Sequence, residues 1–281
     1  MSSVAGPKRS VERAAGQAAP WLESLARLGY AAKGIVYGLI GVFALQAAFG
    51  VGSPNVNQNT VFQRILSQPF GKFLLWIIII GLLGYSLWRL FEAVVDPEYE
   101  GSRKAGSIKR IGFFVSGISY LALSYIAYQV VQGRGGGSGN TGDITARVMR
   151  MPGGQLIIGV IGLIILVVGL YAIYSAYRRS FEKRFQYGRM SAQERTSFIR
   201  LGRFGYAARG VVFALVGVFL AQAAVAANPA KASSGLGGAL VSLTKASYGP
   251  YLLGLVALGL IAFGIYCLVL ARYRQISFNV E

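Results

Sequence analysis

Six long apolar segments constrain the fold of this chain more than any other feature. Each contains about 20 residues or more, which is enough to cross a hydrocarbon core of roughly 30 Å as a helix. They are continuously apolar and contain internal glycines, whereas the strands of a membrane barrel alternate apolar and polar residues. The sequence therefore predicts an all-α, polytopic membrane protein. The predicted spans are residues 28–50, 72–91, 111–132, 154–177, 204–227 and 249–271.

The placement of basic residues predicts the orientation of these spans. With six spans, both termini lie on one side of the membrane, and 21 of the 28 lysines and arginines fall on that side. Basic residues accumulate in short cytoplasmic loops, so we expect a plasma-membrane protein with both termini in the cytoplasm. This bias also accounts for the net charge of +18, and we expect no binding to nucleic acid.

The first, third and fifth spans repeat one motif. The segments "RLGYAAKGIVYGLIGVFALQAA" from Arg27, "RIGFFVSGISYLALSYIAYQVV" from Arg110 and "RFGYAARGVVFALVGVFLAQAA" from Arg203 align without a gap. Each copy is followed by a second span, so every copy returns to the same side of the membrane. We therefore predict three parallel helical hairpins around a pseudo-threefold axis along the membrane normal. The second spans match more loosely, through Gly84, Gly169 and Gly264.

This periodicity divides the chain into four parts. An N-terminal cytoplasmic segment with an interfacial helix covers residues 1–26, and repeats 1, 2 and 3 cover residues 27–109, 110–202 and 203–281. Apolar residues at helical spacing also predict a short interfacial helix before the second span of repeats 1 and 3, near residues 61–66 and 236–243.

The repeated motif resembles a known family, the bacterial integral membrane proteins catalogued as domain of unknown function 1206. The motif "RLGYAAKGIVYGLIG" at 27–41, its copies at 110–124 and 203–217, and the ending "AFGIYCLVLARYR" at 262–274 carry the resemblance. It covers about residues 24–276. The resemblance implies three tandem two-helix units in the bacterial inner membrane, and it implies no activity.

Two of the three repeats carry a cation inside the first span. Lys33 and Arg209 lie six residues beyond the arginine that begins their span, or about 9 Å deeper, and Ser116 holds this position in repeat 2. A cation at the bilayer centre costs roughly 2.5–3.5 kcal/mol, and less when a long side chain snorkels to the interface. We expect such snorkelling. The alternative is a water-filled vestibule containing these three positions, in which aromatic residues on the same helical face support the cations.

Polar and small residues recur further along the same spans. Gln46, Gln129 and Gln222 lie near the far end, where we expect hydrogen bonds between helices; the alternative is a ring along a solute path. They are turned about 220° around the helix from the cations, so one stripe cannot contain both sets. Small residues at helical spacing predict close helix packing. These are Gly34, Gly38, Gly41, Gly117, Gly210, Ala214 and Gly217.

The composition argues against catalysis. The chain has no histidine and one cysteine, and its single carboxylate near a span, Glu92, is expected to pair with Arg89 at a helix end. We therefore predict no catalytic, metal or cofactor site, and a protein that is not an enzyme.

Three functions remain open at this level. The first is a structural or accessory subunit of a membrane assembly, as a homo-oligomer or with a different membrane partner. The second is a passive channel or carrier for a small solute through the pseudo-threefold axis. The third is lipid binding in clefts between the units, which the basic cytoplasmic rim favours. The basic segment "YRRSFEKRF" at 177–185 also predicts contact with anionic lipid head groups at the cytoplasmic face.

Overall fold

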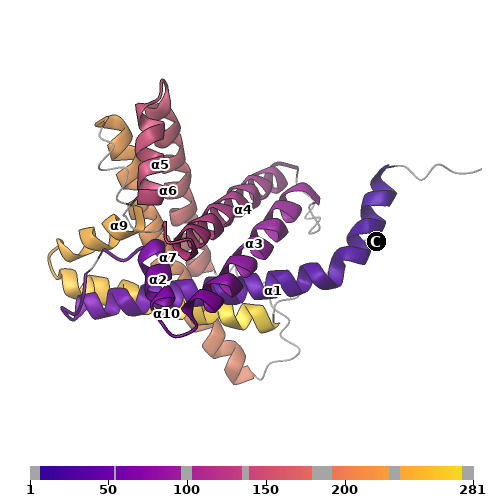
Figure 1. Ribbon diagram of the computed structural model, residues 1–281, viewed down its shortest axis with the longest axis horizontal. Helices are drawn as coiled ribbons and strands as arrows, with labels where there is room; N and C mark the ends of the chain where they lie inside the picture. The colour runs from indigo at the N-terminus through magenta and orange to yellow at the C-terminus, as the bar shows by residue number, and fades with distance from the viewer. Residues whose placement is uncertain are drawn as a thin grey trace, which may run out of the picture.

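The computed structural model describes residues 7–53, 55–95, 103–134, 139–178, 192–227 and 235–273, and within these ranges the chain is helical without strands (Figure 1). Six helices are long and apolar enough to cross a membrane. The expected all-helical fold with six candidate membrane-spanning helices is therefore confirmed. These helices are α1 (Pro7–Ala48), α3 (Gly71–Val95), α4 (Arg103–Val131), α6 (Gly154–Arg178), α7 (Ala192–Val225) and α10 (Gly249–Tyr273).

A short helix precedes the second long helix of every repeat. The short helices are α2 (Gln58–Leu66), α5 (Gly139–Arg150) and α9 (Gly235–Thr244). The sequence predicted α2 and α9 but not α5. At the start of α2, the side chain of Asn57 accepts a hydrogen bond from the backbone N–H of Thr60 at 2.9 Å, which caps the helix. The interfacial helix expected before Arg27 is instead the first part of α1, which continues into the span without a break.

The same turn leads from each short helix into the long helix that follows. One residue of the turn has a left-handed φ: Phe70 at 59°, Gly153 at 75° and Tyr248 at 62°. The next residue is glycine in all three turns, and its N–H donates to the carbonyl three residues earlier at 2.8–2.9 Å. An added Cβ on this glycine would meet the carbonyl of the short helix's last turn. The three glycines are Gly71, Gly154 and Gly249.

Because the three turns are equivalent, they give a residue-by-residue alignment of the second long helices of the three repeats. Counted from the turn glycine, Ser86 of repeat 1 is equivalent to Gly169 and Gly264. The sequence match that set Gly84 beside Gly169 and Gly264 is therefore wrong by two residues. It followed the identity of the amino acid, whereas the register is determined by the geometry of the turn.

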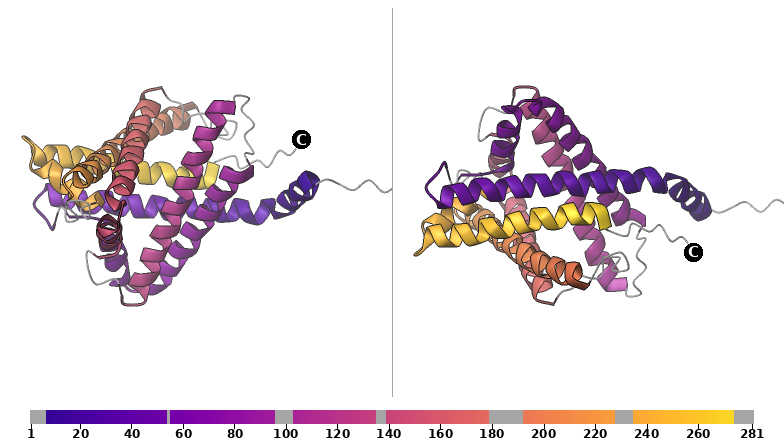
Figure 2. Two further views of the ribbon diagram at one scale, coloured as in Figure 1. Left: turned by 90° about the horizontal axis from the view of Figure 1, so that it is seen from above. Right: turned by 90° about the horizontal axis from the view of Figure 1, so that it is seen from below.

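The long helices pair between repeats rather than mainly within them (Figure 2). Helix α3 of repeat 1 packs on α4 of repeat 2, α6 of repeat 2 packs on α7 of repeat 3, and α10 of repeat 3 packs on α1 of repeat 1. We call these the three inter-repeat interfaces. The two long helices of one repeat also pack on each other in repeats 1 and 3, whereas the described parts of α4 and α6 make no comparable contact.

Equivalent small residues lie at the inter-repeat interfaces. A Cβ added to Gly34 would lie 2.8 Å from the carbonyl oxygen of Gly264, and one added to Gly210 would lie 2.7 Å from that of Gly169. Backbones approach this closely only where side chains are small. Two interfaces, α10–α1 and α6–α7, are thus built on the same pair of glycine positions.

The α3–α4 interface uses a hydrogen bond at the same level. The Oγ of Ser86 donates to the carbonyl oxygen of Gly117 at 2.7 Å, and a Cβ on Gly117 would meet the side chain of Leu90. Ser86 and Gly117 are the equivalents of Gly264 and Gly34. All three interfaces therefore bring the same two positions into contact.

The other small residues singled out in the sequence also lie at these interfaces. Gly41 lies against Ile261 of α10, Gly217 lies against Leu166 of α6, and the backbone of Ala214 lies beside Gly169. The backbone of Gly38 lies beside Gly264, although a Cβ on Gly38 itself would meet nothing within 4 Å.

The arginine that begins the first span contacts the end of the helix packed beside it. Nη1 of Arg27 donates to the carbonyl oxygen of Arg272 at 2.9 Å and to that of Ala271 at 3.4 Å. Nε of Arg203 donates to the carbonyl oxygen of Ala176, the equivalent of Ala271, at 3.2 Å. The last carbonyls of a helix have no partner within the helix and attract cations. We call this end of the bundle the arginine end, and the opposite one the short-helix end.

Candidate functional site

Lys33 lies inside the bundle. The residue is only 6% exposed. Its Nζ lies 5.1 Å from the ring centres of Tyr85 and Tyr120 and 5.3 Å from that of Phe263. These rings come from α3, α4 and α10. The expectation that Lys33 snorkels to the membrane interface is therefore wrong, because rings from three other helices surround its charge.

Arg209, the equivalent of Lys33 in repeat 3, is half-buried and also lies against aromatic rings. Its Cζ lies 4.5 Å from the ring centre of Phe213, 5.0 Å from that of Phe263 and 5.8 Å from that of Tyr37. Its Nε is buried and has no hydrogen-bond partner among the described residues. The side chain thus retains an unused donor in the interior.

We call the rings around Lys33 and those around Arg209 the two aromatic cages, and equivalent residues build both. Each cation faces a ring on the second long helix of its own repeat, Tyr85 or Phe263, and these residues are equivalent when counted from the turn. Each also faces a ring on the first long helix of the repeat packed beside it, Tyr120 or Tyr37. The facing rings meet edge to face, with centres 4.6 Å apart for Tyr85 and Tyr120 and 5.0 Å apart for Phe263 and Tyr37.

Phe263 joins the two cages. The charges of Lys33 and Arg209 both lie within 5.3 Å of its ring centre, so they are separated by no more than twice this distance. Two like charges this close repel each other, and the repulsion is stronger in a protein interior than in water. The two cages therefore form one positively charged site.

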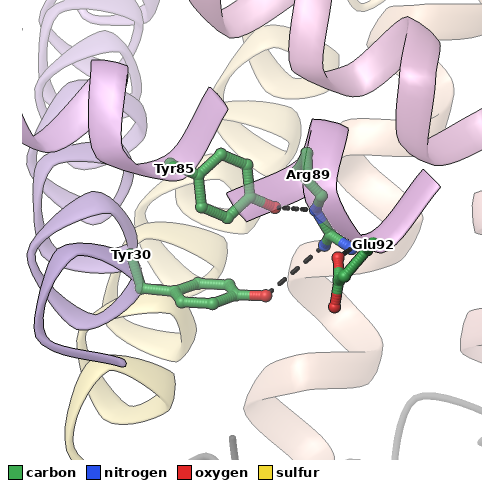
Figure 3. A network of polar contacts seen from close by, with 4 residues as sticks. All are labelled: Tyr30, Tyr85, Arg89 and Glu92. Carbon is green, nitrogen blue, oxygen red and sulfur yellow. Dashed lines mark hydrogen bonds and ion pairs between the residues drawn. The ribbon is translucent and has the colours of Figure 1, made fainter. Parts of the chain in front are cut away.

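Arg89 is a second buried cation, and it is neutralised within its own helix (Figure 3). Nη1 of Arg89 forms an ion pair with Oε2 of Glu92 at 2.6 Å, as the sequence predicted. Its Nε donates to the Oη of Tyr85 at 2.9 Å, and Nη2 donates to the Oη of Tyr30 at 3.4 Å. Tyr85 thus links this ion pair to the cage around Lys33.

The site as a whole carries excess positive charge. Glu92 is the one buried carboxylate among the residues whose burial the structure describes, and it already pairs with Arg89. Neither Lys33 nor Arg209 forms an ion pair within that part of the chain. Desolvating an ion costs several kcal/mol, whereas a buried cation–π contact returns about 2 kcal/mol. Chemically, the site is suited to hold a negative charge.

Repeat 2 contributes rings to this site but no cation. Tyr120 faces Lys33, and Phe113 lies 5.1 Å from the Cζ of Arg89. Ser116, at the position of the cations, is half-buried. The equivalent of Tyr85 and Phe263 in repeat 2 is Val168, which is 37% exposed.

The three glutamines do not belong to the site. Gln46 and Gln222 are exposed, and Nε2 of Gln129 donates to the Oη of Tyr125 on its own helix at 2.6 Å. The hydrogen bonds described for these residues do not join two helices. The sequence had suggested these residues as interhelical contacts or as a ring along a solute path.

Together these features define a helical membrane protein made of three copies of a two-span unit around a buried cationic site. The chain belongs to the family described as Domain of Unknown Function (DUF1206), which matches residues 28–96, 111–179 and 204–274. It is similar to the uncharacterized protein YxxB of Bacillus subtilis (strain 168), with 33% identity over 260 residues, which cover 92% of this chain and 94% of the relative. No solved structure matches the chain.

Proposed function

We propose that this membrane protein binds a small anion between Lys33 and Arg209 and carries it across the bilayer. One observation supports the proposal above all: a buried lysine and a half-buried arginine face the same ring, that of Phe263, and no described carboxylate pairs with either. The role is one of binding and transport rather than catalysis. It corresponds to the carrier alternative of the sequence analysis, with the cations in place of the glutamines.

An anion in this site would relieve three unfavourable features at once. It would attract both cations, reduce the repulsion between them, and accept a hydrogen bond from the unused Nε of Arg209. The surrounding rings present positively polarised edges as well as faces, so an aromatic cage can also accommodate an anion. The close ring contacts limit the ligand to a few atoms, such as chloride, nitrate or a short carboxylate.

The repeat architecture supports a carrier rather than an open channel. Equivalent residues form the three inter-repeat interfaces, which is consistent with a pseudo-threefold axis through the bundle. Glycine contacts close two of these interfaces, and aromatic rings occupy the interior beside the cations. A closed centre with a buried site requires a conformational change for each transport event.

A binding experiment tests the first half of the proposal. In the purified protein in mild detergent, replacing gluconate with chloride or nitrate at constant ionic strength should raise the thermal unfolding temperature saturably. A ligand at 100 times its Kd stabilises by about 2.7 kcal/mol. Lys33→Met and Arg209→Met should each remove the shift, whereas Lys245→Met, at an exposed site of the short-helix end, should keep it. A wild-type protein insensitive to chloride, nitrate and acetate would refute anion binding.

A flux experiment tests the second half. Vesicles that contain the protein and a halide-sensitive dye should respond to external chloride faster than empty vesicles. Lys33→Met should return the rate to that of empty vesicles, while changing Gln46, Gln129 and Gln222 together to leucine should leave it unchanged. Binding without flux would limit the role to anion-dependent stability or regulation.

An accessory subunit is the second candidate, and the surface of α6 supports it. This helix exposes large apolar side chains along its length, among them Leu156 at 74%, Val167 at 57% and Leu170 at 54%. A membrane partner could cover this surface as well as lipid can. Purification from the native membrane in mild detergent, followed by mass spectrometry, should recover a stoichiometric partner if this candidate is correct.

The proposed orientation places both termini in the cytoplasm, on the basis of the charge bias. Ser67 is exposed at the short-helix end, so Ser67→Cys should react with an impermeant thiol reagent added to intact cells. The native Cys267 is buried and should not interfere. Labelling only after lysis would reverse the orientation.

A further inference from the structure

A groove opens between α6 and α7 at the arginine end of the bundle. Its volume is about 460 Å³, and its lining consists of two arginines, two aromatic residues and three aliphatic ones. No acidic residue lines it. The lining residues are Ile173, Ala176, Tyr177, Arg200, Arg203, Phe204 and Ala207. This groove lies at the surface of the bundle, and none of its residues belongs to the cationic site around Lys33 and Arg209.

The polar part of the groove contains hydrogen-bond donors that the described residues do not use. Nε of Arg203 donates to the carbonyl oxygen of Ala176, which holds the guanidinium in place at the end of α6. The described residues offer no ion pair or further hydrogen bond to its terminal nitrogens, and Arg200 is exposed beside them. Both arginines line the groove, and guanidinium groups bind phosphate through paired, charge-assisted hydrogen bonds, so the basic end of the groove is suited to a phosphate group.

The apolar part of the groove lies deeper along the same helices. Phe204 and Ala207 follow Arg203 along α7, and Ile173 precedes Ala176 on α6, so the lining changes from basic to apolar toward the middle of the spans. Tyr177 is exposed at the basic end, where tyrosine is typical of the membrane interface. An amphipathic ligand with an anionic head would match both parts.

The other two repeats lack the second arginine. Counted from the arginine that begins the span, the positions equivalent to Arg200 hold Ser24 in repeat 1 and Ser107 in repeat 2. In repeat 1 a single nitrogen of Arg27 is shared between two carbonyl oxygens of α10. The pair of arginines is therefore a property of repeat 3 and not part of the common plan of the fold.

We infer that the groove between α6 and α7 binds one acidic phospholipid, with the phosphate between Arg200 and Arg203 and an acyl chain along Ile173, Phe204 and Ala207. The lipid belongs to the leaflet at the arginine end. The basic segment at 177–185, proposed from the sequence to contact anionic lipids, lies outside the described residues apart from Tyr177 and Arg178. Arg200 and Arg203 give this contact a defined site.

Native mass spectrometry of the full chain in detergent tests the inference. Titration with phosphatidylglycerol and with phosphatidylcholine of the same acyl chains should show one phosphatidylglycerol bound about thirtyfold more tightly, since each of the two arginines near an anionic lipid contributes about 1 kcal/mol. Arg200→Ser, which introduces the residue of the other two repeats, should reduce the preference for phosphatidylglycerol to about fivefold. Lys245→Ser removes one charge from the opposite end and should leave the preference unchanged.

Two further measurements separate the alternatives. Arg203→Lys keeps the charge but loses the bond from Nε to Ala176, so the lipid preference should weaken while thermal stability without added lipid changes little. Inorganic phosphate at the same concentration should not displace the lipid; displacement would show that the groove binds soluble phosphate instead. Equal affinities for the two lipids, or an unchanged preference in Arg200→Ser, would overturn the inference. None of these results depends on anion binding at Lys33 and Arg209.

Discussion

Repeats 1 and 3 differ from repeat 2 in the way that their two long helices meet. In repeats 1 and 3 the helices pack on each other, and Gly29 and Gly205 lie directly against Tyr85 and Phe263. The equivalent glycine of repeat 2, Gly112, would meet nothing within 4 Å if it carried a Cβ. Closed hairpins thus stand beside one open hairpin in the same fold.

The difference in packing coincides with the difference in charge. The two closed hairpins carry Lys33 and Arg209, and the open one carries Ser116. Each cation faces a ring on the second long helix of its own repeat, Tyr85 or Phe263, and in both repeats that helix packs on the first one. Repeat 2 lacks both the cation and this helix contact.

The largest loss of stability is expected at the Arg89–Glu92 ion pair, which repeat 1 has and repeat 3 lacks. Glu92→Leu leaves Arg89 buried without a counterion and should destabilise the protein by about 3–5 kcal/mol in thermal unfolding. The double variant Arg89→Cys/Glu92→Leu introduces the residues of repeat 3, Cys267 and Leu270, and should recover most of the loss. A double variant as unstable as the single one would show that the ion pair is required by repeat 1 itself.

The second prediction places a cation in the open hairpin. Ser116→Lys should cost about 2–3 kcal/mol, because no ring of α6 is positioned to cover the charge. Adding Val168→Phe, which introduces the residue of repeat 3, should give no rescue because α4 and α6 lie apart. Recovery of the thermal unfolding temperature in the double variant would mean that α4 and α6 can pack on each other. Repeat 2 would then not differ from repeats 1 and 3 as an open hairpin.

The third prediction compares one glycine across the repeats. A Cβ on Gly205 would lie 2.6 Å from the backbone nitrogen of Phe263, and one on Gly29 would lie 2.8 Å from the carbonyl oxygen of Gly81. Changing either to alanine should cost about 1–3 kcal/mol through overpacking. Gly112→Ala should be neutral, or stabilise by up to about 1 kcal/mol through helix propensity. Equal losses at all three positions, measured by thermal unfolding, would contradict the open hairpin.

The smallest effect is expected in the turns, where repeat 2 is the unstrained member. Phe70 has a left-handed φ and is 83% exposed, whereas repeat 2 has Gly153 at this position. Phe70→Gly should therefore stabilise by about 1 kcal/mol, and Gly153→Ala should destabilise by a similar amount. Thermal unfolding of both variants at one detergent concentration measures the pair, and a loss of stability in Phe70→Gly would show that its ring has a separate role.

Local patterns in the sequence predicted the spans, the repeats and two short helices, because each depends on residues close together in the chain. They also identified Lys33 and Arg209 as unusual positions and Arg89 with Glu92 as an ion pair. The environment of Lys33 was mispredicted as a lipid interface, because Tyr120 and Phe263 reach it from distant segments.

The pairing of α10 with α1 has a consequence for how the molecule is assembled. During synthesis the first span is made before the sixth. Gly34 and Lys33 therefore lack their contacts with Gly264 and Phe263 until α10 has been added. Removal of repeat 3 would therefore expose the face of α1 that packs on α10.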